Sequence, residues 1–349
     1  MGRTLKQLID SYRTDPYSDF KTLRYQVRTK RDGELNRLLK EHGSNQLRNI
    51  RFRTLTAWYR DTLADGKVAK ANSLLSRLRE LFRFGSSMLE DADCERLCND
   101  FGKLRLDSSS PRRVKMTAAH VLAISKAARK HFGWPSIGLA QALQFELLRV
   151  QKDVIGEWVP VGEPGTSDLV VGGQKWLRGL RWSDIDENLI LRHKVGSGGH
   201  EIEVDLRTAP MVLHLLKVVA AEGNVRCIPM TMPEVLQRIQ EVRDNPRKHD
   251  SETQPEPSVV ALDELYGLLP HSGPMIICEI NGLPWSAAEF RRKWRLVAKQ
   301  ADLPDNVTNR DSFPAGTVRG GPDRAEIRQT YTLKRLDYGE RMARRKGKK

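Results

Sequence analysis

Apolar residues recur at helical spacing through the first third of the chain. The clearest groups are Leu5, Leu8, Ile9 and Tyr12, then Leu35, Leu38 and Leu39, and then Leu75, Leu78, Leu81 and Phe82. A spacing of three and four residues places such side chains on one face of a helix. The second group ends at Gly43, and glycine is a frequent residue at helix C-termini. Residues 1–106 are therefore predicted to form an all-helical domain.

A polar stretch separates this domain from the rest of the chain. Residues 107–116 read DSSSPRRVKM, and three serines, a proline and a basic cluster are typical of an exposed linker. Thr117 follows as a predicted helix N-cap and opens a second domain, residues 117–340. The basic tail, residues 341–349, is expected to be disordered.

The second domain combines helical and alternating patterns. Apolar residues at helical spacing predict a core helix over 137–147, and LILRHKV, GSGG and HEIEVDL (189–206) predict a β-hairpin. PMIICEINGLPWS (274–286) predicts a strand and a turn, before an amphipathic helix. The polar, Pro-rich stretch near 240–273 is predicted to be a surface insertion. The fold class predicted from these patterns is mainly α with a small β-sheet.

Composition narrows the class of protein. The chain has 349 residues, of which 39% are hydrophobic and 30% charged, as in folded soluble proteins. No apolar run is long enough to cross a bilayer, and the N-terminus lacks a signal-peptide core, so we expect a cytoplasmic protein without a membrane partner. The four cysteines lie at 94, 98, 227 and 278 without a further zinc-ligand pair, so no structural metal is expected.

The net charge is the strongest compositional signal. A formal charge of +15 and a pI near 9.8 favour polyanionic partners, with nucleic acid first and an acidic membrane surface second. A charge that serves solubility alone is the simpler alternative. In the helical domain, few acids interleave with the basic positions, which favours a surface that faces phosphates. These positions are Arg51, Arg53, Arg60, Lys67, Lys70, Arg77, Arg79 and Arg83.

One arginine stands out because its neighbours are those of a core helix. The stretch QFELLRVQKDVIG (144–156) contains Arg149, and a guanidinium in apolar surroundings needs an anionic partner. One hypothesis is an ion pair with Glu146 or Asp153. The other is a phosphate site held on a rigid element.

Several motifs in this order resemble the tyrosine recombinase (phage integrase) family. FELLRV matches the segment of its first active-site arginine, LRGLRWSDIDENLILRHKV its strand and hairpin, and GLPWSAAEFRRKWRLVAKQADLP a later helix. The resemblance implies that residues 1–106 form a core-binding domain and that 117–340 form a catalytic domain. It also implies that double-stranded DNA is the partner, bound by a homo-oligomer.

The family's chemistry assigns roles to individual residues. A tyrosine attacks a DNA phosphodiester and forms a 3′-phosphotyrosine, arginines hold the phosphate oxygens, and a hairpin lysine protonates the leaving 5′-oxygen. The resemblance implies Arg149 and Arg310 as the arginines, Lys194 as the lysine and Tyr338 as the nucleophile. It implies no metal and no cofactor. His193 and His200, beside the lysine, are expected to be surface residues.

The C-terminal part departs from the family pattern. The second box, normally His-x-x-Arg, aligns either with Arg310 and Phe313 or with Val307 and Arg310, so one member is absent in each placement. Tyr331 is an alternative nucleophile to Tyr338. Two functions lead: a DNA strand-transfer enzyme that integrates or excises a mobile element, and a DNA-binding protein of recombinase descent with an impaired active site. A basic adaptor that binds RNA is a distant third, and no RNA-recognition motif supports it.

Overall fold

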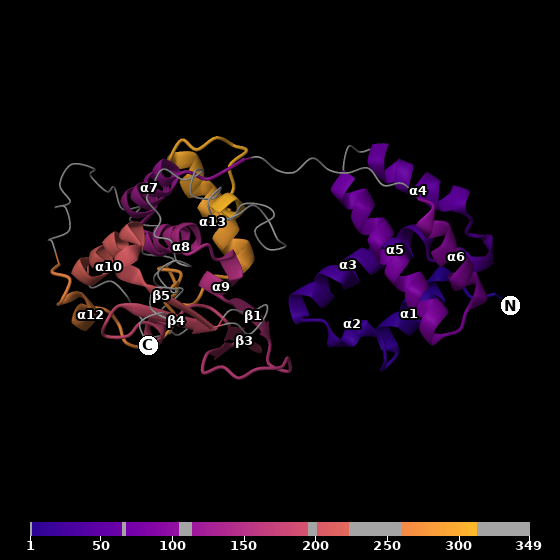
Figure 1. Ribbon diagram of the computed structural model, residues 1–349, viewed down its shortest axis with the longest axis horizontal. Helices are drawn as coiled ribbons and strands as arrows, with labels where there is room; N and C mark the ends of the chain where they lie inside the picture. Colours follow the sequence, from indigo (N-terminus) through magenta and orange to yellow (C-terminus); the bar gives the residue numbers. More distant parts are fainter. Residues whose placement is uncertain (1, 65–67, 105–113, 195–200, 223–259, 313–349) are drawn as a thin grey trace, which may run out of the picture. The chain divides into compact units, whose positions relative to one another are not determined.

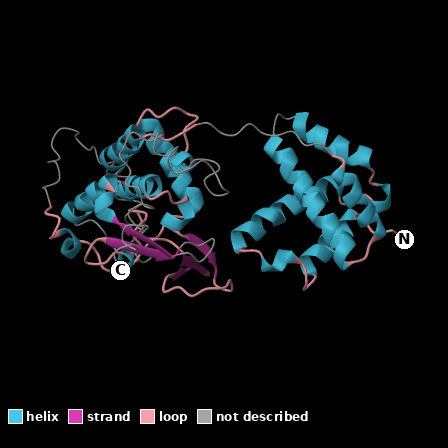
Figure 2. Ribbon diagram, viewed as in Figure 1, coloured by secondary structure: helices cyan, strands magenta, loops and turns pink. Residues whose placement is uncertain are grey.

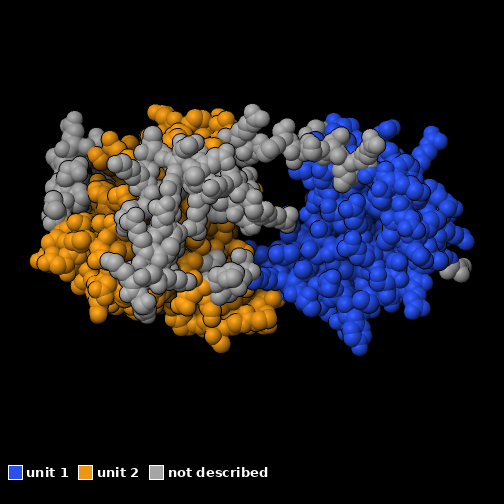
Figure 3. Space-filling model, viewed as in Figure 1, with its two compact units in different colours: residues 1–111 blue, residues 112–349 orange. Residues whose placement is uncertain are grey.

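The computed structural model describes residues 2–64, 68–104, 114–194, 201–222 and 260–312. The chain divides into two compact units, residues 1–111 and 112–349 (Figure 3). The boundary lies inside the stretch 107–116. Each unit has its own hydrophobic core.

The first unit consists of helices in the part of it that the structure describes (Figure 1). They are α1 (Leu5–Thr14), α2 (Asp19–Thr22), α3 (Tyr25–His42), α4 (Phe52–Ala64), α5 (Val68–Met88) and α6 (Ala92–Gly102). Thr4 begins α1 with a capping box, in which its hydroxyl accepts from the Gln7 N–H and the Gln7 side chain accepts from the Thr4 N–H. The helical prediction for this domain is confirmed.

Close packing of α5 on α6 depends on one glycine. A Cβ atom built on Gly85 would lie 2.3 Å from the Cys94 Sγ atom, so no larger residue fits without a shift of the helices. Cys94 is fully buried, and burial raises the pKa of its thiol to about 12. Cys94 is therefore a packing residue in this core.

The second unit is organised around α8. Its helices are α7 (Ala118–Ala127), a π-helical turn (Ala128–Phe132), α8 (Pro135–Glu146), α9 (Gln151–Ile155), α10 (Pro210–Glu222), α12 (Leu265–Leu268) and α13 (Ala287–Gln300). Every residue of 136–145 in α8 is buried, as expected for a helix that other elements surround. The prediction of a core helix here is confirmed.

Two small antiparallel sheets complete this unit (Figure 2). The strands β4 (Ile190–Lys194) and β5 (Glu201–Asp205) pair as the predicted hairpin. The second sheet has the order β1-β3-β2, from β1 (Glu157–Pro160), β2 (Val170–Val171) and β3 (Gln174–Leu177), and the sequence patterns did not predict it.

The strand predicted within 274–286 is wrong. Only isolated bridges form there, Arg181 with Pro274 and Ile277 with Pro284. Each bridge includes a proline, which has no N–H to extend a ladder. The segment instead turns back on itself, with the Cys278 N–H donating to the Leu283 carbonyl at 2.8 Å.

The fold class predicted from the sequence, mainly α with a small β-sheet, is confirmed. Of the predicted insertion at 240–273, only residues 260–273 are described, and they contain α12. The basic tail lies outside the described residues. Among those described, no helix combines the length and apolarity needed to span a bilayer.

Candidate functional site

Arg149 lies directly after α8, not within it as the apolar run suggested. Leu147 ends the helix, Leu148 adopts a left-handed conformation with φ of 53°, and the Arg149 N–H donates to the Gln144 carbonyl at 3.2 Å. This is the Schellman-type ending of a helix, with leucine at a position that usually holds glycine. The half-buried guanidinium donates from Nε to the Leu147 carbonyl at 2.9 Å. Its positive charge therefore lies at the negative end of the helix.

The two carboxylates proposed as partners of Arg149 lie on either side of it in the chain. Glu146 accepts from the backbone N–H groups of Met211 and Val212, at 3.2 and 2.9 Å, and so caps the N-terminus of α10. Asp153 is buried within α9, and its Oδ1 atom has no hydrogen-bond partner among the described residues. Glu146 therefore links the end of α8, close to Arg149, to the start of α10.

α8 is also fixed at its start. The Oε1 atom of Glu279 accepts from the Ser136 N–H at 2.6 Å, and the Ser136 hydroxyl accepts from the Trp285 indole at 3.0 Å. Burial raises the pKa of the Glu279 carboxyl to about 7. The loop at 278–285 therefore caps the start of the helix that Arg149 follows.

Gln141, in the middle of α8, ties this helix to the segment that carries Arg310. Its fully buried Oε1 accepts from the Trp294 indole of α13 at 2.6 Å and from the Asn309 amide at 3.0 Å. Its Nε2 donates to the Ser312 hydroxyl. A buried amide with all these contacts satisfied fixes three segments in one arrangement.

Arg310 is the exposed residue of the short helical turn Asn309–Ser312. Its neighbours Asn309, Asp311 and Ser312 are buried, and Asp311 accepts from the Thr308 N–H at 2.7 Å. Arg310 is thus exposed to solvent on an anchored segment. That segment contacts α8 at Gln141, six residues before Leu147 ends the helix. Val307 is 3% exposed and lies in the core. In the alignment that puts the family's histidine at this position, the side chain therefore could not contact a substrate.

Lys194 ends β4 and is exposed, at the point where the hairpin turn begins. Its neighbour His193 is buried, with Nδ1 2.9 Å from an Asp184 carboxylate oxygen. The expectation that His193 is a surface residue is wrong, because alternation along β4 turns position 193 toward the core. The tyrosine candidates Tyr331 and Tyr338, together with Phe313 and His200, lie outside the described residues.

The first unit has five exposed arginines, on α4 and α5 and directly before α4. Arg51 precedes α4, which carries Arg53 and Arg60, and α5 carries Arg79 and Arg83. None of these five pairs with a carboxylate in the part of the chain that the structure describes.

Arg77 does not belong to this surface. It is half-buried, with Nε 3.2 Å from a Glu34 oxygen and a second ion pair to Glu80. Its inclusion among the outer cations was wrong. Lys67 lies outside the described residues.

The groups that hold the site were hard to predict from local sequence patterns. The two glutamines in the apolar run of α8, Gln141 and Gln144, were the only local signal of this network, since polar residues within buried helices need partners. Glu279 and Asp184 lie far along the chain from the residues that they contact. Their roles depend on tertiary packing.

Comparisons with known proteins identify the fold. No protein-family model matches the sequence, and no curated protein matches it. The solved structures that resemble it include a lambda integrase dimer bound to a COC′ core site, with a TM-score of 0.55, 15% identity, and coverage of 96% of this chain and 75% of that one. A lambda integrase tetramer bound to a Holliday junction gives a TM-score of 0.54 at 15% identity, with 97% and 77% covered.

A third structure is the Tn1549 transposon integrase in complex with transposon right end DNA. Its TM-score is 0.53 at 11% identity, and the alignment covers 99% of this chain and 100% of that chain. Together these similarities show that the chain has the fold of these integrase structures.

Proposed function

We propose that this protein, which has the fold of the lambda and Tn1549 integrases, binds duplex DNA and carries out site-specific strand exchange through a covalent 3′-phosphotyrosine. The observation that carries the proposal is the framework around α8. It anchors Arg149 at the end of a buried helix and, through Gln141, fixes the turn that presents Arg310. The fold extends over both units of the chain.

The proposed chemistry needs two cations at one phosphate. Arg149 and Arg310 would bind the non-bridging oxygens and stabilise the charge that accumulates as the tyrosine oxygen attacks phosphorus. The bond to the 5′-oxygen then breaks, and Lys194, at the end of β4, would donate a proton to that oxygen. Tyr338 would be the attacking residue, with Tyr331 as the alternative.

DNA binding would use both units. Five exposed arginines offer positive charge without acidic partners among the described residues, as expected of a surface that contacts phosphates without reading sequence: Arg51, Arg53, Arg60, Arg79 and Arg83. The integrase structures contain DNA-bound dimers and tetramers, and we propose that this chain likewise acts as a homo-oligomer on DNA.

A second candidate function is DNA binding without cleavage. It is favoured by the second box, since Val307 is buried in the core and the other placement puts Phe313 at the arginine position. If Arg310 does not reach the phosphate, the protein would bind sites at the ends of an element and leave the strands intact.

The experiment that separates these functions traps the covalent intermediate. DNA sequences that the protein binds are first enriched from a randomised duplex pool and then prepared with nicks that let the 5′-hydroxyl fragment diffuse away. The proposed function predicts a denaturation-resistant protein–DNA adduct in wild type that is absent in Tyr338→Phe and present in Tyr331→Phe. Tight binding without an adduct would favour the second function. Loss of the adduct only in Tyr331→Phe would identify Tyr331, not Tyr338, as the nucleophile.

A further inference from the structure

A groove of about 460 Å³ lies in the second unit, between the β1-β3-β2 sheet, the 278–286 loop and the first turns of α13. One wall is a sheet face, since Trp158, Gln174 and Val171 all line the groove, and Gln174 is the register partner of Val171. The other wall includes Ile280, Leu283 and Pro284. The Trp158 indole donates to the Pro284 carbonyl at 2.9 Å, which joins the two walls.

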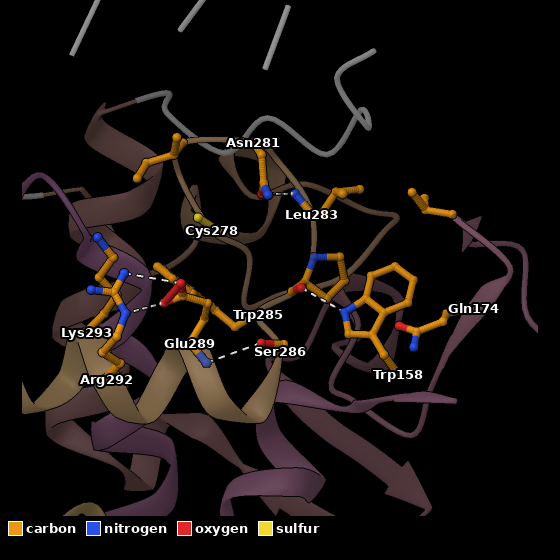
Figure 4. Close-up of a pocket in the computed structure, with 13 residues that line it drawn as sticks. Trp158, Gln174, Cys278, Asn281, Leu283, Trp285, Ser286, Glu289, Arg292 and Lys293 are labelled. Atoms are coloured by element: carbon orange, nitrogen blue, oxygen red, sulfur yellow. Dashed lines mark hydrogen bonds and ion pairs between the residues drawn. The ribbon is translucent and has the colours of Figure 1, made fainter. Parts of the chain in front are cut away.

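Figure 4 shows Gln174 at one side of this groove, Lys293 and Arg292 at the other, and Asn281 between them. Gln174 is exposed and makes no side-chain hydrogen bond among the described residues. Asn281 accepts from the Leu283 N–H at 3.0 Å through Oδ1, which leaves its NH₂ group free to donate. Both side chains can therefore contact the edge of a planar polar ligand.

The charge at the α13 end comes from Lys293. Arg292 and Glu289 neutralise each other through two contacts, at 2.9 and 3.1 Å. Lys293 has no ion pair in the described part of the chain, and its Nζ atom lies 4.4 Å from the centre of the Trp134 ring. Burial lowers the pKa of this lysine, so a bound anion would stabilise its charged form.

The groove lies close to the end of α8. Gln151 follows Arg149 by two residues, and its amide donates to the Ala287 carbonyl at 3.4 Å, beside the groove residue Ser286. Two residues of chain and one side chain put the α13 end of the groove within roughly 15 Å of Arg149. Along a DNA strand, this corresponds to a few nucleotides.

We propose that this groove binds an unstacked nucleotide of the DNA strand near the phosphate that Arg149 holds. The base would stack on Trp158, the amides of Gln174 and Asn281 would contact its edge, and Lys293 would contact a phosphate. The inference rests on the proposed function, since it places the nucleotide by its distance from Arg149. Aromatic stacking with flanking cations is the usual way in which proteins hold unpaired bases.

A protein partner is the other occupant that the groove suggests, because Val171 in its wall and the neighbouring Val161 and Val170 are exposed, at 38%, 51% and 54%. An acidic, apolar peptide could lie along the edge strand β2. The nucleotide is favoured because the free amides and the unpaired lysine gather inside the groove, whereas Val161 and Val170 do not line it.

The test compares two duplexes that differ in one extrahelical base. One carries a single bulged 2-aminopurine and the other is fully paired, and affinity is measured by anisotropy with the full-length chain. We expect wild type to bind the bulged duplex roughly tenfold more tightly and to quench its 2-aminopurine fluorescence. Trp158→Ala and Gln174→Ala should reduce this preference, and Trp158→Phe should retain most of it.

Three controls make the result decisive. Arg60→Ala should weaken both duplexes equally and leave the preference unchanged, and thermal melting should show that each groove variant is folded. Equal affinity of wild type for the two duplexes, or an undiminished preference in folded Trp158→Ala, would overturn the inference and leave duplex binding untouched. Trp158-dependent binding of an acidic, apolar peptide, without preference for the bulge, would assign the groove to a protein partner. Failure to bind either duplex would instead contradict the proposed function.

Discussion

The cations of the two units are held in different ways. Arg149 and Arg310 are attached to a framework of buried hydrogen bonds, whereas Arg79 and Arg83 lie on the exposed surface of α5 without acidic partners among the described residues. An exposed arginine contributes charge that attracts DNA, and its loss is shared among many similar cations. An arginine fixed to a rigid element instead contributes position, which catalysis requires. We therefore expect the exposed arginines of α5 to govern affinity for DNA, and Arg149 and Arg310 to govern the rate of cleavage.

Removal of Arg149 should have the largest effect on cleavage. Arg149→Ala is expected to lower the rate of adduct formation about a hundred- to a thousand-fold, because it removes a positive charge from the place where the transition state accumulates negative charge. Non-specific duplex affinity should fall by less than about threefold, since the other cations remain. The measurement is adduct yield against time, with duplex affinity determined on the same preparation. An equal loss in both would show that Arg149 acts as one more surface cation.

Gln141→Leu should break the framework itself. The change leaves the Trp294 indole, the Asn309 amide and the Ser312 hydroxyl without their shared partner in the interior. Unsatisfied buried groups cost about 1–3 kcal/mol each, so the free energy of unfolding should fall by roughly 3 kcal/mol or more. Urea denaturation measures this, and Gln300→Leu, at an exposed position of α13, is the matched control. Similar stability of the two variants would mean that the network does not fix the site.

The capping of α8 by Glu279 should make the second unit sensitive to pH. Burial raises the pKa of this carboxyl from 4.5 to about 7 in the folded protein, so the folded state binds the proton more tightly than the unfolded state does. Stability from this group is therefore present below pH 4.5 and is lost as the pH rises through 7, by up to about 3 kcal/mol. Urea denaturation at pH 5 and pH 8 gives the free energy of unfolding at each pH. The difference between the two values should be smaller in Glu279→Gln than in wild type. An unchanged difference would show that other groups cause the dependence.

Exposed cations of the first unit should show the smallest effects, and only on affinity. The double change Arg79→Ser and Arg83→Ser is expected to lower the slope of log affinity against log salt by about 2, since each lost phosphate contact contributes about 0.9. Thermal stability should stay close to wild type. Arg207→Ser is a suitable control, because that arginine is exposed but paired with Asp205. An unchanged salt slope in the double variant would remove α5 from the DNA surface.

The parts of this account that follow from local patterns were predictable, and those that depend on distant contacts were not. The helical spacing of Leu75, Leu78 and Leu81 and the alternation around GSGG are properties of adjacent residues, and the structure has both the helix and the hairpin. Alternation along β4 also contained the signal that position 193 is buried. The partner of that histidine, Asp184, lies on a different segment, so its contact could not be predicted from spacing.

The candidate site shows the same division. The apolar run before Arg149 indicated a rigid helix but not the left-handed turn at Leu148 that takes the arginine out of the helix. Gln141 joins residues more than 150 positions apart in the chain, as its contacts with Trp294, Asn309 and Ser312 show. No local pattern encodes such a contact, because it forms only when α8 and α13 pack together.

The proposed catalytic arrangement can be seen directly in a structure of the full chain bound to an enriched, nicked DNA site. We expect the guanidinium groups of Arg149 and Arg310 to contact oxygens of one and the same phosphate, with Lys194 near the 5′-oxygen and a C-terminal tyrosine facing phosphorus. If Arg149 remains turned toward its own helix, and Arg310 contacts a different phosphate or solvent, the proposed catalytic arrangement is contradicted.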